Sequence, residues 1–156
     1  MDRVQKADNF FCQGYNCAQS VAGAFIEDER LSRDIVFKLT NGFGGGMGRR
    51  QEVCGALSGA IMVLGLNRGR GVNDDKEKQE ETYAHVRALM NDFQKVYGSV
   101  YCRDLLGSCD LSTSEGQRQF VEQGLKNRCR EFIQYVIRYI DTNESCGATS
   151  ESEQLT

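Results

Sequence analysis

Seven cysteines are the residues of this sequence best suited to chemistry, and two of them hold positions that favour a thiolate. Cys17 follows the turn Gly14-Tyr15-Asn16, Cys54 follows a glycine-rich segment, and each enters an expected helix. A helix N-terminus stabilises negative charge through its free N–H groups and its dipole, which lowers the pKa of a cysteine there. Arg49 and Arg50 precede Cys54 and would lower its pKa further. We therefore expect Cys54, and after it Cys17, to be the reactive or metal-bound sulfurs.

The spacing of the cysteines does not define a site by itself. No Cys-x-x-Cys occurs, so a thioredoxin-like dithiol and a zinc ribbon lose their usual sequence support. Any site must therefore be assembled by the fold from distant helices. Free cysteine is also among the most buried residue types, so simple packing is the alternative interpretation for each of the seven.

His85 is the only histidine and lies in a strongly charged stretch. A nucleophilic Cys-His pair would require that stretch to reach Cys54. A solvated or structural His85 is the simpler interpretation.

The segment 42–48 contains five glycines in seven residues, too many for a helix. We expect a loop whose backbone packs closely against something, with Gly44, Gly45 and Gly46 as candidate contacts to a bound cofactor. The segment lacks the Gly-Lys-Ser/Thr ending of a phosphate-binding loop and does not fit Gly-x-Gly-x-x-Gly. Close packing is thus favoured over a nucleotide.

The composition is typical of one soluble domain. The chain has 156 residues, of which 40% are hydrophobic and 26% charged, and a net charge of -3 that excludes a general basic surface for nucleic acid or membrane. No apolar stretch follows the charged N-terminus, and the most apolar run, residues 53–66, is broken by glycines and too short for a membrane span. We expect a cytoplasmic protein, where seven thiols do not form a disulfide framework.

The apolar spacing predicts an all-α fold, a single-domain helical bundle of about six to seven helices with the glycine-rich loop before a central helix of small residues. Asn16 and Ser32 are expected N-caps, and Ser114 to Gln117 matches a capping box. The helical domain is predicted over 1–141 and a polar tail over 142–156. The expected helices cover about 2–11, 17–27, 33–39, 54–66, 74–97 and 129–140, with shorter turns of helix near 100–107 and from 114.

Five segments, taken in order, resemble a known family. They are Gly14-Tyr15-Asn16-Cys17-Ala18-Gln19, Gly42-Phe43-Gly44-Gly45-Gly46-Met47-Gly48, Cys54-Gly55-Ala56-Leu57-Ser58-Gly59-Ala60, Cys102-Arg103-Asp104-Leu105 and Cys129. Over about residues 5–140 the sequence resembles the C_GCAxxG_C_C proteins, a family named as redox-active. One departure is that this chain reads Cys54-Gly55-Ala56 where the family name puts glycine before cysteine.

The resemblance implies that Cys17, Cys54, Cys102 and Cys129 are the signature cysteines. Cys12, Cys109 and Cys146 are then additional. The family is similar to the N-terminal part of split-Soret cytochromes, where an iron-sulfur centre has been suspected. The haem does not carry over, because this chain has no Cys-x-x-Cys-His.

Two kinds of redox chemistry fit four such cysteines. Four thiolates from four helices would suit zinc or an iron-sulfur cluster, and the same four could exchange with disulfides, with Cys54 attacking and a second cysteine resolving. We expect a redox-active oxidoreductase or electron carrier with a redox partner protein, and the small-residue faces would allow a homodimer. The alternative is a non-catalytic helical binding protein with buried, packing cysteines, and a cysteine-nucleophile enzyme is a third.

Overall fold

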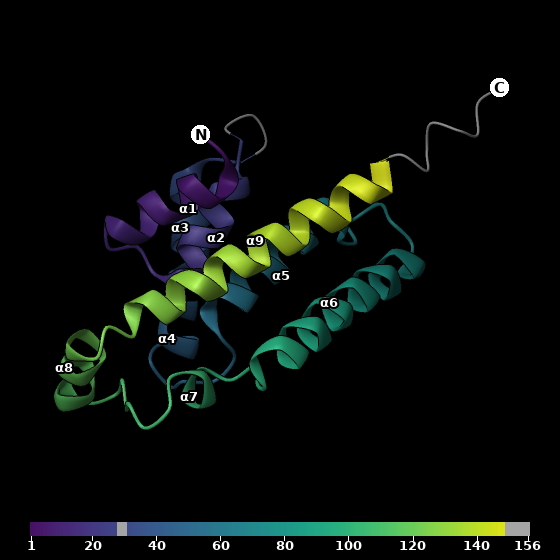
Figure 1. Cartoon of the computed structure of the whole chain (residues 1–156). Helices are drawn as coiled ribbons and strands as arrows, with labels where there is room; N and C mark the ends of the chain where they lie inside the picture. The colour runs from purple at the N-terminus through teal and green to yellow at the C-terminus, as the bar shows by residue number, and fades with distance from the viewer. Residues whose placement is uncertain (28–30, 149–156) are drawn as a thin grey trace.

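The computed structural model describes residues 1–27 and 31–148, with side chains up to residue 144, and its regular elements there are helices. The expected all-α fold class is confirmed (Figure 1). The elements are α1 (Arg3–Cys12), α2 (Cys17–Phe25), α3 (Arg33–Thr40), the 3-10 turn η1 (Asn41–Phe43), α4 (Gly44–Met47), α5 (Gly55–Arg68), α6 (Lys76–Tyr97), α7 (Cys102–Leu105), α8 (Ser114–Glu122) and α9 (Lys126–Ala148).

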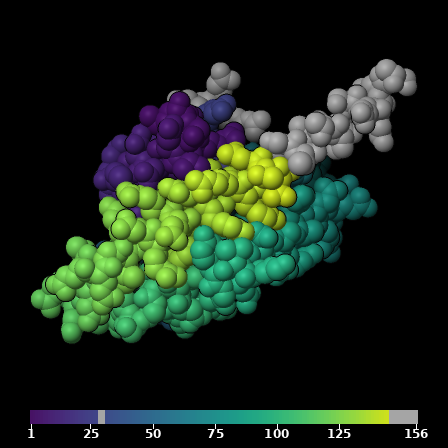
Figure 2. All heavy atoms as spheres, viewed as in Figure 1, coloured from purple at the N-terminus to yellow at the C-terminus, as the bar shows by residue number. Residues whose placement is uncertain are grey.

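Helix α5 is the centre of the bundle, as its small, apolar sequence predicts. It packs against α2, α6 and α9, while α1 packs against both α2 and α9. Figure 1 shows α9 running across the molecule in front of α5, with α1 and α2 on one side and α6 on the other. In the space-filling view, α9 lies along α6 over much of one face (Figure 2).

Glycines on α5 let α2 approach its backbone closely. A Cβ added at Gly59 would stand 2.7 Å from the carbonyl oxygen of Ala18, and one added at Gly55 would stand 3.2 Å from the Cβ of Cys17. A Cβ at Gly59 would require α2 to shift, and one at Gly55 would make a contact tighter than most real Cβ contacts. The small residues of α5 are therefore a packing surface for α2.

Side-chain caps set several helix starts. Asn16 accepts from the backbone N–H of Gln19, and the Gln19 side chain accepts from the N–H of Asn16, which confirms the expected N-cap of α2. Ser32 caps α3 as expected. The capping box expected to begin at Ser114 is wrong by one residue, because the side chain of Thr113 accepts from the N–H of Gly116 and caps α8.

The glycine-rich segment forms a left-handed turn. Gly45, Gly46, Met47, Gly48 and Arg49 have φ angles between 63° and 68°, so the hydrogen-bonded turn of α4 is not right-handed helix within that run. This agrees with the expectation that five glycines prevent an ordinary helix. Two of the five positions nevertheless hold side-chain residues in a conformation that favours glycine.

Helix α9 extends beyond its apolar face. The expected inward residues Phe132, Ile133, Val136, Ile137 and Ile140 are all buried. The helix nevertheless continues to Ala148, where we expected a polar tail from 142.

Polar pairs stabilise this extension of α9. Arg68 pairs with Glu144 at 3.2 Å, and Arg3 pairs with Asp141 at 2.5 Å. Residues 149–156 of the expected tail lie outside the described part of the chain. Within residues 1–27 and 31–148, no helix combines the length and apolar content needed to cross a membrane.

Candidate functional site

A cavity of about 640 Å³ brings together the four signature cysteines. Cys17, Cys54, Cys102 and Cys129 all line it. Apolar side chains and the glycines of the left-handed turn form much of the remaining wall: Phe11, Gly44, Gly45, Gly46, Leu105, Leu106, Leu111, Phe120 and Phe132. The fold therefore assembles one site from cysteines that the sequence spreads over more than a hundred residues.

Each of these four cysteines lies at the N-terminal end of a helix. Cys17 is the first residue of α2, Cys54 is the N-cap of α5, Cys102 is the first residue of α7, and Cys129 lies in the first turn of α9. From the sequence, a pKa lowered by the helix end was expected only for Cys17 and Cys54. The partial positive charge of several helix ends therefore faces one sulfur-lined cavity.

A short antiparallel bridge places Cys54 beside Cys102. Val53 pairs with Tyr101. The N–H of Cys54 donates to the Val100 carbonyl at 2.8 Å, and the N–H of Cys102 donates to the Glu52 carbonyl at 2.7 Å. The two helix starts are thus tied together through backbone hydrogen bonds rather than through their side chains.

Gln51 fastens the next loop to this bridge and was not identified from the sequence. Its buried side chain donates from Nε2 to the Cys109 carbonyl at 2.8 Å, and its Oε1 accepts from the N–H of Leu111 at 3.0 Å. Arg103 adds a bond to the Gln51 carbonyl at 3.1 Å and an ion pair with Glu52 at 2.5 Å. Nothing in the sequence around Gln51 marks it, because the partners come from a loop far along the chain.

Cys17 and Cys129 are interacting thiols whose pKa values shift in opposite directions. A hydrogen-bonding interaction with Cys129 is the largest cause that raises the pKa of Cys17 well above its ordinary value, and burial adds to it. The same interaction is the largest cause that lowers the pKa of Cys129, where nearby Arg128 helps and burial opposes. Of the two thiols, Cys129 is therefore the one that ionises more readily.

The expectation of a lowered pKa at Cys54 is wrong. Burial raises the pKa of Cys54 to about 12, although the backbone N–H groups of Ala56 and Leu57 act in the opposite direction. Burial also raises the pKa of Cys102 to about 12, with further contributions from Cys54 and Cys129. Desolvation outweighs the helix end because both side chains are almost wholly removed from water.

Arg49 and Arg50 were expected to lower the pKa of Cys54, but neither contributes to its pKa shift. Arg50 points to Glu52 at 4.0 Å and is 80% exposed. Arg49 lies exposed at the cavity wall.

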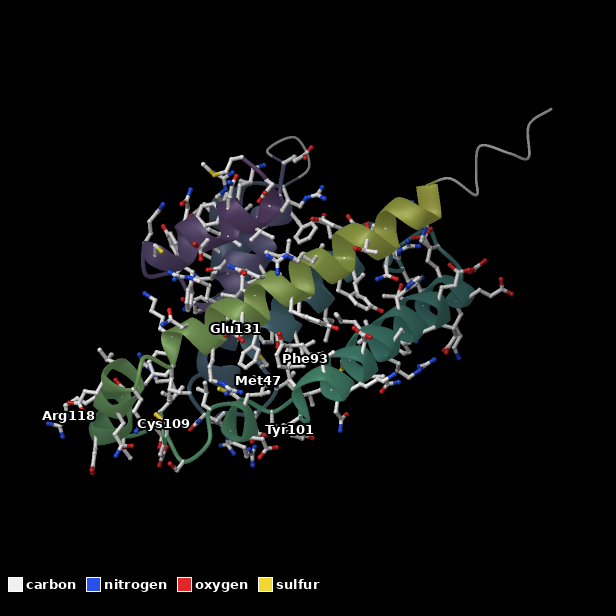
Figure 3. The ribbon with its side chains drawn as sticks, viewed as in Figure 1. Met47, Phe93, Tyr101, Cys109, Arg118 and Glu131 are labelled. Carbon is white, nitrogen blue, oxygen red and sulfur yellow. The ribbon has the colours of Figure 1, made fainter. Side chains whose placement is uncertain are left out.

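The glycines of the left-handed turn pack against the elements that carry the cysteines. A Cβ at Gly46 would stand 2.8 Å from the Cβ of Cys102, and one at Gly44 would stand 2.5 Å from the Asn16 side chain that caps α2. Figure 3 shows Met47 of this turn and Tyr101 of the bridge toward the α4 and α7 end of the molecule. Gly44, Gly45 and Gly46 all line the cavity, and their contact with a cofactor stays a prediction.

The thiols are not arranged around a single ion as they stand. Among the described side chains, those of residues 1–27 and 31–144, no three or more His, Cys, Asp or Glu form a group that could hold one metal ion. The chemistry of the donor set is nevertheless uniform, since the four such side chains lining the cavity are soft sulfurs.

The remaining candidates lie elsewhere. Cys109 is buried beyond α7, where its thiol donates to the Gly116 carbonyl at 2.9 Å, and Cys12 is exposed and accepts from Arg130 at 3.2 Å (Figure 3 labels Cys109). The side chain of Cys146 is outside the described residues. His85 is exposed on α6 and does not line the cavity, so the Cys-His pair does not form there.

Comparison with known proteins agrees with this cysteine framework. A family model described as "Putative redox-active protein (C_GCAxxG_C_C)" matches residues 15–143, a range that contains all four cavity cysteines. The chain belongs to the C_GCAxxG_C_C family. A relative from Archaeoglobus fulgidus, described as an uncharacterized protein, is 30% identical over 114 residues, which cover 69% of this chain and 76% of the relative. No solved structure matches the chain.

Proposed function

We propose that this C_GCAxxG_C_C protein is a cytoplasmic electron carrier or oxidoreductase whose cavity cysteines hold an iron-sulfur cluster. The observation that carries the proposal is the meeting of Cys17, Cys54, Cys102 and Cys129 in one cavity. A bound cluster would supply one-electron chemistry, and thiolates are its ordinary protein ligands.

The protein's own groups favour an anionic, sulfur-bound centre. Backbone N–H groups at the start of α5 stabilise negative charge at Cys54, and a backbone N–H and Arg128 do so at Cys129. The raised pKa values of Cys54 and Cys102 mean that near neutral pH these thiols give up their protons only when a metal takes the place of the proton. Loading of the centre therefore releases protons and is favoured as the pH rises.

The bridge and the Gln51 contacts would orient the site before it is filled. The bridge holds the backbone of Cys54 and Cys102, and Gln51 holds the neighbouring loop at Cys109 and Leu111, through hydrogen bonds that do not involve the sulfurs of Cys54 and Cys102. Such supporting contacts commonly govern affinity at sulfur-ligated centres.

Anaerobic purification with iron, zinc and acid-labile sulfide analysis and an absorption spectrum tests the proposal. We expect iron, sulfide and visible absorption that are lost in Cys54→Ser and Cys129→Ser but kept in the matched variants Cys109→Ser and Cys12→Ser. If the analysis finds zinc and no sulfide, the cysteines hold a zinc site instead of an iron-sulfur cluster. Colourless, metal-free protein from cells grown with ample iron would refute both.

A second candidate function is thiol-disulfide exchange at Cys17 and Cys129. The hydrogen-bonding interaction between these two thiols and the lowered pKa of Cys129 support it. The Cys129 thiolate would attack a disulfide of a partner protein and release one partner thiolate. Cys17 would then resolve the mixed disulfide, so that two electrons pass to the partner and an internal disulfide forms.

Thiol counting on cluster-free protein tests this second candidate. Oxidation by a disulfide reagent should remove two thiols from the native chain and from Cys12→Ser. In Cys17→Ser and Cys129→Ser the number of free thiols should not fall by two, because the internal disulfide cannot form. Equal counts before and after oxidation of the native chain would exclude the exchange.

The remaining expectations about partners belong to the same proposal. A redox partner protein would exchange electrons at the cavity. A homodimer would have to use another surface, because the small residues of α5 pack against α2, and light scattering tests for it. A non-catalytic interaction protein would instead lose only stability in Cys54→Ala, with metal content and thiol reactivity unchanged.

A further inference from the structure

The charged side chains around the cavity all have one sign. Arg49 and Lys126 line it, and no Asp or Glu of the described residues does. The chain as a whole has a net charge of -3, so this positive lining runs against the general charge of the molecule. A cleft lined by one sign of charge concentrates the opposite sign at its mouth.

Arg49 holds its place in a backbone conformation that favours glycine. Its φ angle is 67°, and it follows Gly45, Gly46 and Gly48, which adopt the same left-handed region. It has no ion pair with the described residues. A glycine at this position would relieve the backbone but remove the only positive charge that this turn contributes to the cavity.

Lys126 lies at a helix start, where its stabilising contact is an aromatic ring rather than the helix dipole. It is the first residue of α9, where the helix dipole favours anions over cations. Its exposed ammonium group lies 5.1 Å from the ring centre of Phe11, which itself lines the cavity. The Phe11 ring therefore holds one cation at the cavity, and the left-handed turn holds the other.

The cavity wall behind the two cations is largely apolar. Leu105, Leu106 and Phe120 contribute to it beside the cysteines. A ligand that matches both features has an anionic head group and an apolar body of a few carbons.

We propose that the cavity admits a small organic anion, of the carboxylate class, whose head group lies at Arg49 and Lys126 and whose body lies against the apolar wall near the cysteines. This inference rests on the proposed redox function, since it names the class of reactant that would reach that centre. The described cavity has the volume for such a molecule, at about 640 Å³.

Equilibrium dialysis of the purified protein with labelled benzoate and labelled benzamide tests this site. The two probes have similar shape and differ in charge. We expect benzoate to bind roughly threefold to tenfold more tightly than benzamide, the range that two exposed charge contacts supply. The preference should shrink in Lys126→Gln and Arg49→Gly and remain in the control Arg87→Gln, whose charge is exposed on α6 away from the cavity.

The choice of glycine at position 49 keeps the test decisive. Arg49→Gly removes the charge while relieving the left-handed backbone, so lost preference in a protein of undiminished stability cannot be attributed to unfolding. Equal binding of both probes to the native chain overturns the site, as does a full benzoate preference in either folded variant. Iron and sulfide measured in the same samples separate the two proposals: cluster-free protein that still prefers benzoate contradicts the cluster alone, and cluster-bearing protein without the preference contradicts the anion site alone.

Discussion

Gly46 lies so close to Cys102 that a Cβ on the glycine would stand 2.8 Å from the Cβ of the cysteine. The same added atom would also stand 2.8 Å from the Cα of Gln51 and from the backbone nitrogen of Glu52. The left-handed turn is thereby pressed against the strand-like segment that precedes Cys54. The conformation of the turn and the position of Cys102 therefore depend on the same packing contact.

Gly46→Ala should therefore cost more stability than Gly48→Ala. Both glycines have positive φ angles, of 68° and 63°, but an added Cβ at Gly48 meets nothing within 4 Å. Gly48→Ala should cost about 1–2 kcal/mol of backbone strain. Gly46→Ala should cost about 1–3 kcal/mol more from the overpacked contact. Urea unfolding of the two variants measures the difference, and equal losses would contradict the close contact.

Two glycines of α5 should respond to alanine with opposite signs. A Cβ at Gly59 would stand 2.7 Å from the Ala18 carbonyl, whereas one at Gly65 meets nothing within 4 Å. Gly65→Ala should stabilise the protein by up to about 1 kcal/mol, because alanine is the better helix former. Gly59→Ala should destabilise it by about 1–3 kcal/mol by separating α2 from α5. Thermal or urea denaturation gives both values, and a stabilising Gly59→Ala would disprove the close packing.

Gln51→Ala should destabilise the protein and loosen the site. The change leaves the Cys109 carbonyl and the Leu111 N–H without their side-chain partners, at a cost of about 1–3 kcal/mol. Alanine keeps the positive φ of 55° at this position, so backbone strain stays the same. The matched control is Gln94→Ala on the exposed surface of α6, which should change the free energy of unfolding by less than about 0.5 kcal/mol. Faster alkylation of Cys102 in Gln51→Ala, read by mass spectrometry, would accompany the loss.

The reduced, cluster-free protein should lose stability as the pH rises above about 9. Cys54 and Cys102 ionise near their ordinary value of 9.0 in the unfolded chain but only near 12 in the folded one. Their contribution to stability is complete below pH 9 and is lost as the pH rises toward 12. Within that window each thiol should lower the free energy of unfolding by about 1.4 kcal/mol per pH unit.

Urea midpoints between pH 8 and 10.5 would measure this slope. The double variant Cys54→Ala, Cys102→Ala should have the shallower dependence, because it keeps the other titrating groups and lacks these two. Parallel curves for the variant and the native chain would contradict the burial of the two thiols.

Much of the helical framework could be predicted from local signals. Asn16 and Ser32 are short polar residues directly before apolar-periodic stretches, and both cap the helices expected of them. The apolar face of α9 was visible because Phe132, Ile133, Val136, Ile137 and Ile140 repeat at helical spacing. The end of that helix was not, because polar partners far away in the sequence, such as Arg68 for Glu144, extend it.

The candidate site was predictable in its members but not in its electrostatics. The motif order led to the four cysteines that line the cavity. The pKa ranking among them failed because a helix start and a nearby arginine are visible in sequence, while the degree of burial and the hydrogen-bonding interaction of Cys17 with Cys129 are not. The role of Gln51 was invisible for the same reason, since its partners at 109 and 111 belong to another loop.

The start of α9 has a consequence for how the protein matures. Cys17, Cys54 and Cys102 leave the ribosome in that order, and Cys129 follows only with the last described helix. That helix also packs on α1, α2, α5 and α6, so the contacts that complete the bundle form only once α9 has been synthesised. A centre that uses all four sulfurs is thus completed after translation has passed α9, and its insertion can act as the closing step that locks the first and last helices together.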